Sequence, residues 1–88
     1  MLKDIPRETA LTILCRTEEG IFADTALALA RQKLDARDSA FLLELVYGTL
    51  RNRSLLDWTL NRFSAKPVDT TDAWTRNILR LAAYQMLF

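Results

Sequence analysis

The sequence of 88 residues contains no histidine, and its only cysteine is Cys15. Without histidine, the chain lacks both the commonest general base and the commonest metal ligand of proteins. A single cysteine forms no internal disulfide and cannot hold a zinc ion by itself. These absences argue against a catalytic or metal site and fit a reducing compartment, so we expect a cytoplasmic location.

Long apolar runs and glycine-rich segments are also missing. The start, Met1–Pro6, has an acidic residue and a proline where a signal peptide would need an apolar stretch. No run of about 18 apolar residues is present that could span a membrane. The two glycines are too few for a phosphate-binding loop. The net charge is only +1, so any RNA binding must come from local clusters of cations.

Helical periodicity is what the sequence does contain. Half of its residues are hydrophobic, and in five segments they recur every three or four positions. We therefore predict an all-α bundle of about five helices that forms a single domain over residues 1–88. Helices often begin at a side chain that can accept a hydrogen bond from a free backbone amide of the first turn. On this ground we place the helix starts at Asp4, Asp24, Asp35, Ser54, and Thr71 or Asp72.

The third of these segments is strongly apolar but carries one glycine, Gly48. A glycine inside a helix costs about 1 kcal/mol relative to alanine, so a packing reason is expected. We predict that another backbone passes close to Gly48. The helix is apolar on most of its circumference, with Tyr47 extending the apolar surface, and we expect it to be the central helix.

Three motifs follow one another along the chain: Glu44-Leu-Val-Tyr-Gly-Thr-Leu-Arg51, Leu56-Asp57-Trp58 and Arg76-Asn-Ile-Leu-Arg-Leu-Ala-Ala-Tyr84. In this order and spacing they resemble the NusB-like domain, from about Pro6 to Phe88. The resemblance is strongest to the N-terminal domain of RsmB-type (Sun-type) 16S ribosomal RNA cytosine-C5 methyltransferases. It implies a NusB-like bundle that helps to position small-subunit ribosomal RNA for a separate catalytic domain.

The resemblance also bears on chemistry and completeness. In those methyltransferases the attacking cysteine and the S-adenosylmethionine site belong to the C-terminal domain, so no cofactor and no catalytic residue are expected here. The apolar stretch Ile78–Phe88 has no helix stop signal, whereas a complete NusB-like domain continues with further helices. We expect the domain to be truncated, so that the apolar surface on Ile78–Phe88 that those helices would cover is left exposed. Such a surface predicts a homodimer or a helix-exchanged oligomer.

Cations are the candidate RNA-binding residues. NusB-like domains bind single-stranded RNA through a basic surface that includes the start of the first helix, where this chain has Lys3 and Arg7. Arg53, Arg62 and Arg76 are the further candidates, because guanidinium groups match the geometry of phosphate oxygens. The alternative for each is an ordinary solvated or structural charge.

Other residues are assigned structural roles. Arg80 lies among apolar residues, where an unpaired charge would cost several kcal/mol, so we expect an acidic partner and propose Glu44. Arg51 lies where a cation meets the C-terminal dipole of a helix favourably. Three aromatic residues at helical spacing are expected in the core, with stacking on RNA bases as the alternative: Trp58, Trp74 and Tyr84.

Two other functions stay open. One is a NusB transcription antitermination factor, although its usual dense N-terminal arginine run is missing. The other is a protein-interaction module that packs against its own methyltransferase domain or a ribosomal protein, which the small net charge favours.

Overall fold

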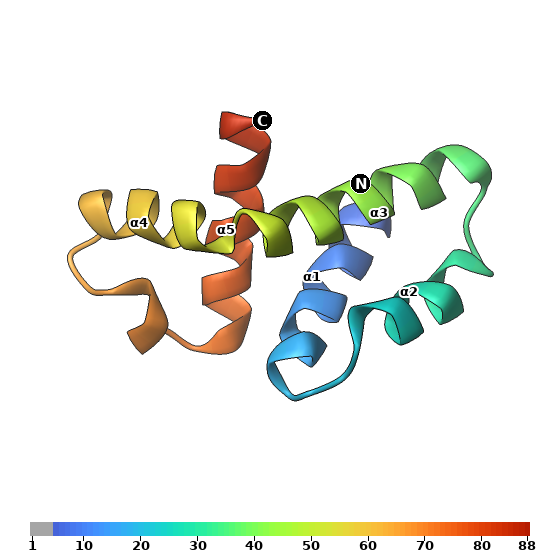
Figure 1. Cartoon of the computed structure of the whole chain (residues 1–88), viewed down its shortest axis with the longest axis horizontal. Coiled ribbons are helices and arrows are strands. Elements are labelled where there is room, and N and C mark those ends of the chain that lie inside the picture. Colours follow the sequence, from blue (N-terminus) through green and yellow to red (C-terminus); the bar gives the residue numbers. More distant parts are fainter. Residues whose placement is uncertain (1–4) are drawn as a thin grey trace.

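The computed structural model describes residues 5–88, and all regular structure in this range is helical (Figure 1). The prediction of an all-α fold with five helices is therefore confirmed. The elements in chain order are α1 (Ile5–Glu18), α2 (Ala23–Arg31), α3 (Ala36–Arg51), α4 (Arg53–Phe63), the short 3-10 helix η1 (Val68–Thr70) and α5 (Ala73–Leu87).

Two of the predicted helix caps are confirmed. Asp35 caps α3 by accepting a hydrogen bond of 2.8 Å from the backbone amide of Asp38. Asp72 caps α5 in the same way, accepting from the amide of Thr75 at 3.2 Å. Each side chain satisfies an amide that has no partner within its helix. The predicted cap at Asp4 lies outside the described residues.

Two other predicted caps are wrong. α2 begins one residue before Asp24, whose carboxylate instead accepts a hydrogen bond from the hydroxyl of Tyr47 on α3. That hydrogen bond is the main reason why the pKa of Tyr47 is raised. α4 begins before Ser54, directly after Asn52. The side-chain amide of Asn52 donates to the carbonyl of Gly48 at 2.8 Å and so caps the end of α3. Asn52 is the only residue between α3 and α4.

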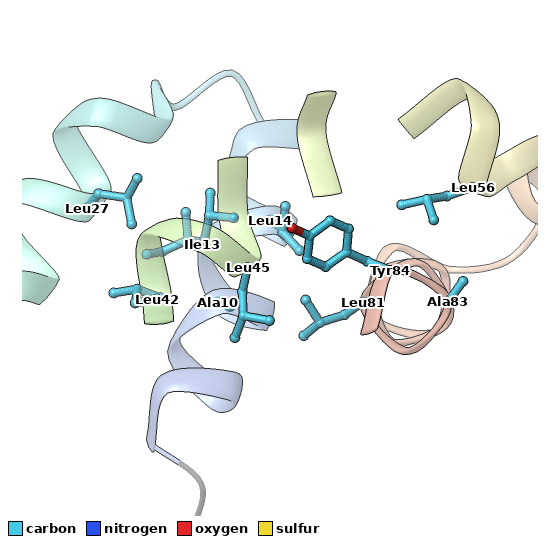
Figure 2. Packing of buried hydrophobic residues seen from close by; sticks show 11 residues of the cluster. Ala10, Ile13, Leu14, Leu27, Leu42, Leu45, Leu56, Leu81, Ala83 and Tyr84 are labelled. Carbon is cyan, nitrogen blue, oxygen red and sulfur yellow. The ribbon is translucent and has the colours of Figure 1, made fainter. Parts of the chain in front are cut away.

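α3 is the central helix, as predicted, because it packs against α1, α2, α4 and α5. In Figure 1, α3 and α4 follow one another along the long axis of the molecule, and α5 crosses near their junction. Within residues 5–88, no helix combines the length and the apolar character needed to cross a membrane. The core shown in Figure 2 is formed by Ala10, Ile13, Leu14, Leu27, Leu42, Leu45, Val46, Leu56, Leu81, Ala83 and Tyr84.

Gly48 lies at the contact between α3 and α5. A methyl group added at this position would overlap the ring and hydroxyl of Tyr84. The predicted close approach exists, but the expected neighbouring backbone is wrong, since an aromatic side chain fills the space. Tyr84 is 8% exposed, so its predicted place in the core is confirmed. Figure 2 shows its ring extending from α5 toward the core side chains of α1 and α3.

Candidate nucleic-acid interface

A buried arginine joins α4 to α5. Arg80 is 4% exposed, and its guanidinium donates to both carboxylate oxygens of Asp57, at 2.7 and 2.8 Å. Glu18 at the end of α1 adds a longer ion pair of 3.4 Å. An acidic partner is thus present, but its predicted identity as Glu44 is wrong. Glu44 lies on the exposed side of α3, whereas Asp57 and Glu18 flank the buried guanidinium.

Arg76, one of the candidate RNA-binding residues, belongs to the same group of charges. Its guanidinium forms an ion pair with Glu18 and also donates to the backbone carbonyl of Thr71. The side-chain amide of Asn77 donates to Glu18 at 2.6 Å. The hydrogen bond from Arg76 is the main reason why the pKa of Glu18 is lowered, with Asn77 contributing. The Arg76 side chain is therefore mostly engaged inside the protein.

Cys15 lies beside this group and is half-buried. Its thiol donates to the carbonyl of Ala73 at 3.7 Å and accepts from the amide of Asn77 at 3.6 Å. Burial is the main reason why the pKa of Cys15 is raised, so the nucleophilic thiolate is disfavoured. Within residues 5–88, no group of side chains is arranged to hold a metal ion.

The start of α1 carries the second candidate cation. The guanidinium of Arg7 lies 5.1 Å from the centre of the Phe41 ring and donates to the side chain of Gln85 at 2.7 Å. Arg7 is exposed, and these two contacts hold its side chain against α3 and α5. Lys3, the neighbouring candidate, lies outside the described residues.

The stretch from the end of α3 to the loop after α4 is the most basic exposed part of the described chain. Arg53 opens α4 and Arg62 lies in its last turn, and both are exposed. Arg51 and Lys66 add two further exposed cations. The one carboxylate between residues 51 and 66 is Asp57, which is bound to Arg80. The small net charge of the whole chain therefore hides a local excess of positive charge.

An exposed tryptophan lies within this basic stretch. Trp58 is 58% exposed, and the guanidinium of Arg62 lies 4.9 Å from its ring centre. Such a cation–π contact at an exposed site contributes about 0.5–1 kcal/mol. The prediction that Trp58 is a core residue is wrong because Leu56 takes the buried position of α4, and a residue two places later points about 200° away. Trp74 at the start of α5 is likewise exposed rather than in the core.

The comparisons with known proteins agree with this fold. A family model described as the NusB family matches residues 4–88. The chain belongs to the NusB family. No solved structure was found to match it.

This NusB-family chain is also similar to curated proteins called ribosomal RNA small subunit methyltransferase B. Those of Escherichia coli O1:K1 / APEC, Shigella boydii serotype 18 and Escherichia fergusonii are each 32% identical over 71 residues. The aligned part covers 81% of this chain and 17% of each relative. The chain thus spans under a fifth of the length of these relatives, and the resemblance inferred from the three motifs is confirmed.

The three motifs of this NusB-family chain meet in the structure. The first provides Gly48 on α3, against which Tyr84 of the third motif packs. The second provides Asp57 on α4, which binds Arg80 of the third. Trp58 of the second motif is instead directed to solvent. The surplus of cations near Trp58 in the sequence was a sign that this side chain is exposed. Helical spacing alone suggested a core position.

Proposed function

We propose that this NusB-family chain is a non-catalytic RNA-binding domain that positions a segment of 16S ribosomal RNA for a methyltransferase domain. The observation that carries the proposal is the basic stretch between residues 51 and 66, whose only carboxylate, Asp57, is bound to Arg80. The name of the relatives, which refers to small-subunit ribosomal RNA, supports the choice of substrate.

Phosphate contacts by exposed guanidinium groups provide the affinity in this proposal. Arg53 and Arg62 are the main contributors, and Lys3 and Arg7, which lie near each other in the sequence, are further candidates. Arg76 contributes less, because Glu18 already holds its guanidinium. These contacts fix the register of the RNA and do not read its sequence.

Salt dependence tests this proposal. Fragments of small-subunit ribosomal RNA are titrated with the chain at two salt concentrations and compared with the variants R53A and R62A. Each phosphate contact on a single strand changes the slope of log K against log salt by about 0.7, so each variant flattens the slope by roughly that amount. R37A, which removes an exposed cation from the first turn of α3, is the matched control and leaves the slope unchanged. Absence of binding at low salt overturns the proposal.

The same proposal gives this chain no chemical step. Cys15 is its only thiol, and the raised pKa of that thiol together with the lack of histidine leaves it without activation. Neither glycine offers a backbone cradle for a cofactor, since Gly20 lies in an open turn and Gly48 is covered by Tyr84. S-adenosylmethionine would therefore be held by the methyltransferase domain.

A second proposal is association through α5, because apolar residues are exposed along it. Ile78, Met86, Leu87 and Phe88 are all exposed. Ile78 also lines a groove of about 230 Å³ between α1 and α5, which is formed by Arg7, Glu8, Leu11, Ile78, Leu81, Ala82 and Gln85. We propose that a second copy of the chain covers this face when the chain is alone, and that the methyltransferase domain covers it in a longer protein. Transcription antitermination is less supported, since the relatives carry a methyltransferase name.

A further inference from the structure

We propose that the exposed face of α4 formed by Leu55, Trp58 and Arg62 is a stacking site for an unpaired RNA base. This inference rests on the proposed RNA-binding function and adds the part of the RNA that the domain recognises. The ligand is one unpaired nucleotide, with its base on the Trp58 ring and its phosphate near Arg62.

Helical geometry brings the three side chains together. Leu55, Trp58 and Arg62 are spaced at i, i+3 and i+7, so they lie on one side of α4. Leu55 and Trp58 are both exposed, and Arg62 covers only part of the indole. An indole ring that is more than half exposed retains a surface on which a base can stack, and every base has an aromatic face to offer.

The side of α4 away from this site is firmly held. Leu56 is fully buried in the core, and Asp57 is clamped by Arg80. Near the end of the helix, the side-chain oxygen of Asn61 accepts a hydrogen bond of 2.8 Å from the amide of Val68, a buried residue of η1. These contacts present Trp58 without a rearrangement of the backbone, which lowers the ordering cost of binding.

Local charge favours RNA over an apolar protein surface as the occupant. Four cations lie between residues 51 and 66, and the single carboxylate among them is already paired with Arg80. A protein surface that covered Trp58 would have to desolvate or neutralise nearby cations, whereas a nucleotide brings a phosphate that pairs with them. Arg62 can stack on the indole and donate to a phosphate with the same planar group.

Tryptophan fluorescence tests this site directly, because the chain has two tryptophans, Trp58 and Trp74. The W74F chain keeps Trp58 as its only indole, and the W58F chain keeps Trp74 as the matched control. Both are titrated at low salt with an oligouridylate of about ten nucleotides, a typical length for one single-strand site. We expect quenching of Trp58 to saturate with binding, and little change in the fluorescence of Trp74.

Affinity provides the second measurement. W58A should weaken binding of the oligouridylate about ten-fold, and should change binding of duplex RNA of equal length by less than two-fold, because paired bases cannot reach the indole. F22A is the matched control, since Phe22 is an aromatic residue 80% exposed just before α2. It should change neither affinity. Helix content by circular dichroism establishes that each variant is folded.

The outcomes separate this inference from the function on which it rests. RNA binding without quenching of Trp58, or an equal loss for single-stranded and duplex RNA in W58A, overturns the stacking site and leaves RNA binding in place. Loss of self-association in W58A with unchanged RNA affinity shows a protein contact and also overturns it. Absence of any RNA binding at low salt overturns both proposals.

Discussion

The ring and hydroxyl of Tyr84 occupy the space that a side chain at position 48 would need. α3 and α5 can therefore approach closely only because residue 48 is glycine. The helix loses about 1 kcal/mol of intrinsic stability through this glycine, and burial of the aromatic ring offsets the loss. Gly48 and Tyr84 thus form one structural unit, although they belong to different sequence motifs.

Gly48→Ala should destabilise the fold. The gain in helix propensity of about 1 kcal/mol is smaller than the cost of displacing Tyr84, which lies at the upper end of the roughly 1–3 kcal/mol range for overpacking. We expect a net loss of about 1–2 kcal/mol in the free energy of unfolding, measured by urea denaturation. In a Y84L background the obstructing ring is absent, so the same alanine should stabilise. A wild-type background stabilised by G48A would contradict this account.

Arg80→Ala should have a large effect and Glu44→Ala almost none. Removing the guanidinium leaves the carboxylate of Asp57 without its ion-pair partner in a region that is mostly shielded from water, whereas Glu18 keeps Arg76. A loss of about 3 kcal/mol in unfolding free energy is expected for R80A. E44A changes an exposed residue and should stay within about 0.5 kcal/mol. A loss for E44A as large as that for R80A would restore Glu44 as the partner.

Acid should weaken the fold through Glu18. Its pKa is lowered in the folded protein, chiefly by Arg76, so the unfolded chain takes up a proton first as the pH falls. The stabilisation is complete above the ordinary glutamate pKa of about 4.3 and disappears as the pH drops through the lowered value. Denaturant midpoints between neutral pH and about pH 3 should fall less steeply for E18Q than for the wild type. If the denaturant midpoints of E18Q and the wild type fall in parallel with pH, the acid sensitivity belongs to other carboxylates.

Self-association should depend on the end of α5. Phe88 is 65% exposed, although its ring stacks on Tyr84 with a centroid distance of 5.3 Å. Light scattering at concentrations on the order of tens of micromolar should show a dimer or larger species, and F88D should shift it to the monomer. F22D introduces the same charge at a different exposed aromatic position and should leave the association state unchanged. A wild-type chain that remains monomeric at this concentration would count against the α5 contact.

Local signals in the sequence predict the helices well, whereas they do not predict which side chains of different helices are in contact. Asp35 and Asp72 were identified as caps because a cap depends on residues only three positions away. The partners of Arg80 were missed because Asp57 and Glu18 are 23 and 62 positions distant, and the choice depends on how α1, α4 and α5 pack. The predicted core position of Trp58 is wrong for a related reason, since helical spacing defines a face of the helix without showing whether another helix covers that face.

The ion pairs around Glu18 also carry a kinetic consequence. They join the first helix to the last across 58 and 62 positions of the chain, so we expect them to form late in folding, because closing a long loop costs conformational entropy. Contacts made late in folding mainly slow the escape from the native state and hardly change the rate of reaching it. We therefore expect the charged cluster to lower the unfolding rate of this small protein more than it changes the folding rate.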